Sequence, residues 1–170
     1  DAHSLIEIFN RRLKYEDDFF FAFELDVRNC LVSFFWRDKQ MLDDYVLFGD
    51  LVVFDTTYRT NKYYMICAPF VGMNHHSQNV MFGCGFLMNE RIESFVWLFK
   101  TFLKSMGGKH PITVMTDQTF SMASAIKSVF PLARHRLCCW HIIENSRKHI
   151  GHLRSCEGFT KIFNRVLLDC

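Results

Sequence analysis

The sequence predicts a mixed α/β fold, in which a central sheet carries helices on its faces. Residues 51–88 contain three short apolar runs joined by turn-forming segments, a pattern typical of an antiparallel meander. Residues 90–139 then alternate helical and strand patterns, which predicts β-α-β crossovers onto the same sheet. The 170 residues are 49% apolar and include 19 Phe, so one domain can bury a substantial core.

Helices and strands also precede the predicted meander. The apolar positions of residues 2–13 recur near helical spacing, which predicts an amphipathic helix: Leu5, Ile6, Ile8, Phe9 and Leu13. Residues 19–27 and 31–36 have the composition of two strands around a turn. Residues 39–48 predict a second helix that ends at Gly49, a residue favoured just beyond a helix C-terminus.

The core elements follow in order. Residues 51–55, 63–71 and 80–88 predict the three strands of the meander, and Pro69 indicates an edge or a bulge in the second. Residues 90–106 predict a helix that stops at Gly107-Gly108. The remaining predicted elements are a strand at 112–116, a helix at 120–130, a short strand at 136–139 and a helix at 141–152.

We expect three regions along the chain: a lead-in over 1–48, the core over 49–152, and the start of a further helical region over 153–170. Because the chain opens on Asp1 rather than Met and stops at Cys170, we expect it to be part of a longer protein. The seven scattered cysteines form no disulfide framework, which favours a reducing intracellular compartment. The apolar runs are too short to span a bilayer, so no membrane partner is expected.

The net charge of +2 is too small to indicate nucleic-acid binding by itself. Basic residues do cluster on both sides of the Cys-x-x-His. Arg134, His135 and Arg136 precede it, and a second group follows it, for which a solvated helix face is the favoured explanation: Arg147, Lys148, His149, His152 and Arg154.

Two aspartates each end an apolar strand. Asp55 follows residues 51–54, and Asp117 follows residues 112–116. If a crossover places the second strand parallel to and beside the first, both carboxylates meet at one sheet edge. Carboxylate oxygens on a rigid edge suit Mg²⁺ or Mn²⁺, and a two-metal site activates a water or hydroxyl for phosphoryl transfer. The alternative is that each Asp is a cap or turn residue.

A Cys-x-x-His motif follows the last predicted strand. Cys138 and His141 have a spacing that allows a shared metal ion, but two ligands do not complete a structural zinc site. A packing and hydrogen-bonding role is the alternative. Trp140 between them is expected in the core. No nucleophile elbow, phosphate-binding loop or dinucleotide fingerprint is present in the sequence, so other hydrolase and kinase readings have no support.

Taken together, these segments resemble the MULE (Mutator-like) transposase domain, in the version found in the plant far-red-impaired-response and far-red-elongated-hypocotyl family of transposase-derived transcription regulators. The resemblance rests on four stretches: FGDLVVFDTTYRTNKYYMICAPFVGMNHHSQNVMFGCGFL, ESFVWLFKTFL, ITVMTDQ and AIKSVFPLARHRLCCWHI.

The resemblance implies a ribonuclease-H-like fold, in which Asp55 and Asp117 match the first two acids of an Asp-Asp-Glu triad and Cys138 with His141 matches the C-x-x-H motif. The third acid of such transposases lies beyond this chain, so the chain alone would not complete a catalytic site. One departure is Thr119, where the family usually has a second acid after Asp117 and Gln118. The resemblance further implies nuclear localisation, DNA binding mainly through flanking zinc-binding domains, and dimers with itself or related proteins.

Three hypotheses about the function of the chain follow. The first is a transposase-derived core within a nuclear regulator of transcription, without transposition activity. The second is an active Mutator-like transposase that cuts and joins DNA with Mg²⁺ or Mn²⁺ at Asp55 and Asp117. The third is the product of a decayed element, against which the uninterrupted apolar patterning argues.

Overall fold

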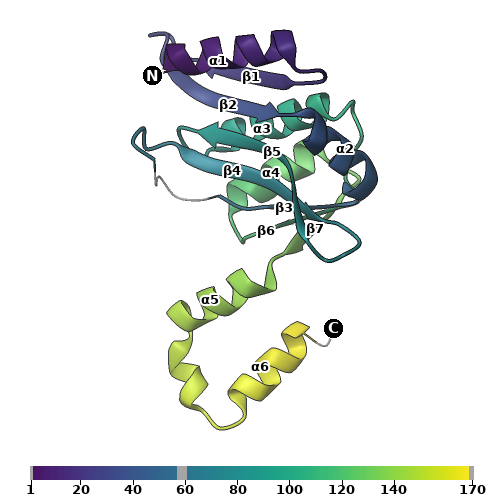
Figure 1. Ribbon diagram of the computed structural model, residues 1–170. Coiled ribbons are helices and arrows are strands. Elements are labelled where there is room, and N and C mark those ends of the chain that lie inside the picture. Colours follow the sequence, from purple (N-terminus) through teal and green to yellow (C-terminus); the bar gives the residue numbers. More distant parts are fainter. Residues whose placement is uncertain (1, 57–60, 169–170) are drawn as a thin grey trace.

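The chain folds around one seven-stranded mixed sheet, with strand order β1-β2-β5-β4-β3-β6-β7 (Figure 1). The computed structural model describes residues 2–56 and 61–168. The strands are β1 (Phe20–Leu25), β2 (Leu31–Arg37), β3 (Leu51–Phe54), β4 (Ile66–Met73), β5 (Asn79–Leu87), β6 (Thr113–Thr116) and β7 (Arg134–Leu137). The helices are α1 (Ala2–Tyr15), α2 (Lys39–Phe48), α3 (Ile92–Ser105), α4 (Phe120–Val129), α5 (Cys139–His149), the 3-10 helix η1 (Gly151–Ser155) and α6 (Phe159–Leu168). The predicted mixed α/β class is confirmed.

The pairing of the strands places several strand ends at one edge of the sheet. β5, β4 and β3 form the predicted antiparallel meander, while β6 lies parallel to β3 and β7 lies parallel to β6. The predicted parallel arrangement of the first and fourth core strands is therefore confirmed. Because β5 is separated from β3 by one antiparallel strand, β3, β5, β6 and β7 all run in the same direction. Their carboxyl ends share one edge.

The main core lies between the sheet and helices α2, α3 and α4. It is rich in fully buried aromatic rings: Phe35, Tyr45, Phe54, Phe70, Phe82, Phe95, Phe99 and Phe102. Helix α1 covers the other face over β1 and β2, where Phe9 packs against Phe19 and Phe34 in a second, smaller cluster. The alternation of Phe34 and Phe35 along β2 serves both clusters, because successive strand side chains point to opposite faces.

The structure tests two predictions that rest on special residues. Helix α2 ends at Gly49 as predicted, with a φ of −73° that is not left-handed. A Cβ there would lie 2.4 Å from the carbonyl oxygen of Tyr45, so close approach explains the glycine. Pro69 lies in β4 between β5 and β3, so the edge alternative is wrong, whereas the register irregularity between Phe70 and Val71 agrees with the bulge.

The second core strand starts three residues later than predicted, at Ile66 rather than Tyr63. The Asn61 side chain explains the difference, because its amide donates to the carbonyl of Met65 and its oxygen accepts from the N–H of Met65. These bonds hold the preceding residues in a turn, where the backbone groups of Tyr63 and Tyr64 bond locally with Asn61.

Beyond β7 the chain leaves the sheet. Helix α5, η1 and α6 form an extension that projects from the body of the molecule, which we call the C-terminal arm (residues 139–168; Figure 1). Trp140 was predicted to pack in the core and is instead 62% exposed, because α5 starts where the sheet ends and does not lie over it. Over residues 2–56 and 61–168, no helix combines the length and apolar character needed to cross a membrane.

Candidate functional site

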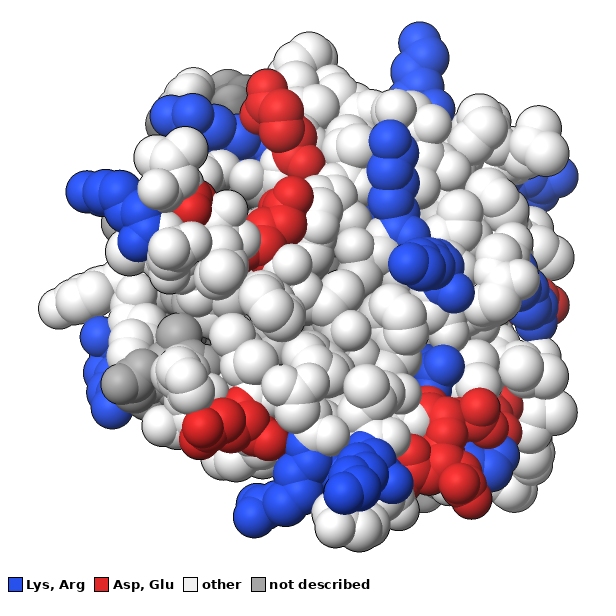
Figure 2. All heavy atoms as spheres, turned by 90° about the horizontal axis from the view of Figure 1, so that it is seen from above, with Lys and Arg blue, Asp and Glu red and all other residues white. Residues whose placement is uncertain are grey.

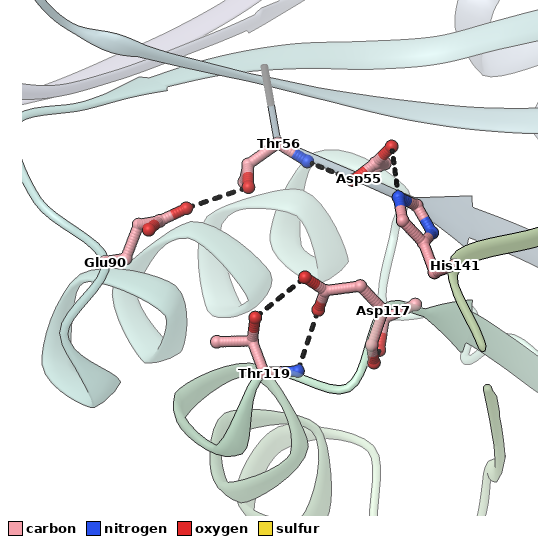
Figure 3. Close-up of polar contacts among 7 residues, drawn as sticks. Asp55, Thr56, Glu90, Asp117, Thr119 and His141 are labelled. Carbon is pink, nitrogen blue, oxygen red and sulfur yellow. Dashed lines mark hydrogen bonds and ion pairs between the residues drawn. The ribbon is translucent and has the colours of Figure 1, made fainter. Parts of the chain in front are cut away.

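The shared carboxyl edge of β3, β5, β6 and β7 gathers the polar residues that follow each strand. Asp55 follows β3, Glu90 lies just beyond β5, Asp117 follows β6 and Cys138 follows β7. Figure 3 shows the three carboxylates near the ends of their strands, with the imidazole of His141 from α5 facing Asp55. The topology thus brings Asp55 and Asp117 to the same edge, as the sequence predicts.

The Asp55 carboxylate contacts the backbone of the next residue and a histidine of the C-terminal arm. Its Oδ1 accepts a 2.8 Å hydrogen bond from the N–H of Thr56, and its Oδ2 lies 3.6 Å from Nε2 of His141 (Figure 3). The Asp55 side chain is 52% exposed and that of His141 23%. The contact is an ion pair when His141 is protonated, and solvent screening at this exposure keeps it weak. It nevertheless places an imidazole directly against one of the two family-matched carboxylates.

Asp117 is occupied by a local turn. Its Oδ1 accepts from the N–H of Thr119 at 2.9 Å, and its Oδ2 accepts from the Thr119 hydroxyl at 2.8 Å (Figure 3). Thr119 is the residue before α4, so this carboxylate satisfies a donor at the helix N-terminus and lies where the helix dipole favours negative charge. The cap or turn role that the sequence left open is therefore present at Asp117.

Glu90 is an acid of this edge that sequence analysis missed. Its Oε1 accepts a 2.8 Å hydrogen bond from the hydroxyl of Thr56, the residue after Asp55 (Figure 3). The signal was available, because a strand two places away in a meander runs in the same direction and must end at the same edge. Two further acids, Glu144 and Glu157, lie elsewhere: Glu144 pairs with Arg147 on α5, and Glu157 is exposed.

A cavity of ≈ 250 Å³ opens beside Asp55. It is lined by Val53, Phe54, Asp55, Met115, Thr116, Cys138, Trp140 and His141. The walls are mostly apolar, with the Asp55 and His141 pair as the charged feature. The C-x-x-H motif thus has a defined place, since Cys138 and His141 both line this cavity at the start of α5.

Near the cavity, His135 joins β7 to β6. Its Nε2 lies 2.8 Å from the Thr116 hydroxyl, which is also within hydrogen-bond distance of the carbonyl of Asp117. Which of His135 Nε2 and the Thr116 hydroxyl donates in their contact depends on the tautomer of the imidazole. Burial lowers the pKa of His135 from its ordinary value, and the nearby Asp117 carboxylate partly opposes that shift. His135 is therefore neutral near pH 7.

The side chains at this edge do not fit a metal ion as they are arranged. Within residues 2–56 and 61–168, no three His, Cys, Asp or Glu side chains are placed so that they can share an ion. Both oxygens of Asp117 accept from Thr119, and Asp55 faces an imidazole. The same limit applies to zinc, because Cys138 and His141 have no third ligand in that part of the chain.

The fold and this edge define a class of protein. A meander continued by two parallel strands, with acids after the first and fourth core strands, is the core of a ribonuclease-H-like transposase domain. The MULE transposase domain model matches residues 51–145, which is more than half of the chain, and the chain belongs to that family.

Its relatives in Arabidopsis thaliana agree with this assignment. Protein FAR1-RELATED SEQUENCE 5 is 43% identical over 136 residues, covering 80% of this chain and 17% of the relative. Protein FAR-RED IMPAIRED RESPONSE 1 is 38% identical over 168 residues, covering 98% of this chain and 20% of the relative. Protein FAR1-RELATED SEQUENCE 12 is 40% identical over 147 residues, covering 86% and 19%. The chain spans about a fifth of the length of these relatives. The resemblance seen in the sequence is confirmed.

Proposed function

We propose that the chain is the transposase-derived core of a nuclear regulator of transcription, and that it serves there as a scaffold without transposition activity. One observation carries the proposal. The carboxylates at the sheet edge are engaged with protein groups, namely Thr56, Thr119 and His141. Relatives named for the far-red response support the regulator assignment.

The partners follow from the same proposal. DNA is contacted mainly through flanking zinc-binding domains, and the protein pairs with itself or with related family members in the plant nucleus. The transposase-like core supplies a rigid body to which those domains attach. These assignments rest on the family resemblance, since the chain covers only about a fifth of its relatives.

An active Mutator-like transposase is the second candidate. The observation in its favour is the parallel pairing of β3 with β6, which keeps Asp55 and Asp117 at one edge together with Glu90. Activity would require these carboxylates to leave their present partners and a third acid to join them around Mg²⁺ or Mn²⁺. A suitably placed Glu beyond residue 170 is the feature that separates the two candidates.

A Mn²⁺ titration of the full-length protein by calorimetry tests the proposal, with Asp117→Asn as the comparison. We expect no saturable heat in either protein, and we expect Asp55→Asn to leave the output of a transcription reporter unchanged. Saturable binding that Asp117→Asn removes, together with Mn²⁺-dependent strand transfer, would establish the enzyme instead. Failure of the full-length protein to associate with promoter DNA would overturn the regulator assignment.

A further inference from the structure

Charge is distributed unevenly along this chain. Residues 1–133 contain 13 Lys or Arg and 15 Asp or Glu, a net −2, whereas residues 134–170 contain seven and three, a net +4. The boundary coincides with the start of β7, after which the chain leaves the sheet. The small net charge of the whole chain is therefore the sum of a net negative segment, residues 1–133, and a net positive segment, residues 134–170.

The basic side chains of β7 and the arm are available to a partner. Arg134, Arg136, Arg147, Lys148, Lys161 and Arg165 are exposed. In the part of the chain that the structure describes, only Arg147 among these six forms an ion pair, with Glu144. In the body, Arg12, Arg28 and Lys39 each pair with a neighbouring carboxylate, and the net charge there is negative. Figure 2 shows the face seen from above, where basic and acidic side chains are interspersed.

The shape of the arm suits a long ligand rather than a small one. It stands clear of the body (Figure 1), and its exposed basic residues lie on α5 and α6. The 11 residues of α5 span about 16 Å, a length over which duplex DNA presents about ten phosphate charges. The exposed Trp140 indole adds an aromatic surface at the base of the arm.

We propose that the C-terminal arm, together with Arg134 and Arg136 of β7, is a docking surface for the phosphate backbone of duplex DNA. This inference deepens the proposed function, on which it rests, by assigning DNA contact to the core itself and not only to flanking domains. The carboxylates of Asp55, Glu90 and Asp117 repel phosphate, so the DNA lies along the arm and stays outside the acidic edge.

Fluorescence anisotropy with a labelled duplex at several salt concentrations tests this surface. The arm variant combines Arg136→Gln, Lys148→Gln and Lys161→Gln, all at exposed positions that form no ion pair with another described residue. The matched control combines Lys100→Gln, Lys104→Gln and Lys127→Gln, which remove the same charge from exposed positions on α3 and α4. Far-ultraviolet circular dichroism of both variants verifies the fold.

Each lost phosphate contact lowers the slope of log K against log salt by about 0.9, and lowers affinity about eightfold at ~0.1 M salt. We expect the slope of log K against log salt to be smaller in magnitude by about 2.7 for the arm variant, and to equal the wild-type slope for the control. Equal loss in both variants would overturn the inference, as would tighter binding to single-stranded RNA, and in those cases the reporter and Mn²⁺ experiments would still decide the proposed function separately. An absence of duplex binding by the full-length protein would overturn both the inference and the regulator assignment.

Discussion

A single pair of neighbouring residues shows how this fold presents a polar site. Phe54 is fully buried, and its ring centroid lies 4.8 Å from that of Phe70 and 4.9 Å from that of Phe99. The next residue, Asp55, is exposed. The aromatic anchor fixes the end of β3 and therefore the position of the Asp55 carboxylate. Packing and site geometry are coupled at this point of the chain.

Phe54→Ala should lower the free energy of unfolding by about 3–5 kcal/mol, since it leaves a cavity among rings that cannot collapse fully. Urea denaturation followed by circular dichroism measures the change. Phe120→Ala is the control, because Phe120 is 78% exposed and its truncation should change stability by less than about 0.5 kcal/mol. A loss below about 1 kcal/mol for Phe54→Ala would contradict this account of the core.

At the scale of elements, the short edge strand β7 depends on few contacts. Among the strands of the described residues it pairs with β6 alone, and His135 adds the side-chain hydrogen bond with Thr116. The lowered pKa of His135 makes the stability of this region depend on pH. The unfolded chain takes up a proton near 6.5, above the pKa of the folded state, so unfolding is favoured as pH falls through that range.

We therefore expect the wild-type chain to be less stable at pH 5.5 than at pH 7.5, and expect His135→Gln to reduce that difference. Urea midpoints across the pH range provide the measurement. His149→Gln serves as the comparison, because His149 is exposed on α5 and its removal should leave the pH dependence unchanged. A pH dependence that survives His135→Gln intact would assign the effect to another group.

At the scale of the whole molecule, the C-terminal arm lies outside the apolar clusters that stabilise the fold. The members of both apolar clusters, and the partly buried side chains packed against them, lie between Leu5 and Ala133. The arm contacts the body through polar pairs such as His141 with Asp55 and Asn145 with Gln118. Exposed polar contacts of this kind contribute about 0–1 kcal/mol each.

A chain that ends after Cys138 should unfold cooperatively with a free energy within about 1 kcal/mol of that of the 170-residue chain. Parallel urea denaturations of the two proteins check this. A loss of about 3 kcal/mol or more would mean that the arm is part of the folding unit, contrary to the separation of its contacts from both clusters.

The sequence by itself determined the fold class, the meander, the parallel placement of the β6 strand and the meeting of Asp55 with Asp117 at one edge. Apolar periodicity and strand-end position are local properties, and the crossover follows from the order of elements. Only the tertiary structure decided that Glu90 bonds to Thr56, that His141 faces Asp55, and that Trp140 is exposed. Those outcomes depend on where α5 leaves the sheet and on hydrogen bonds between segments far apart in the chain, which no local pattern encodes.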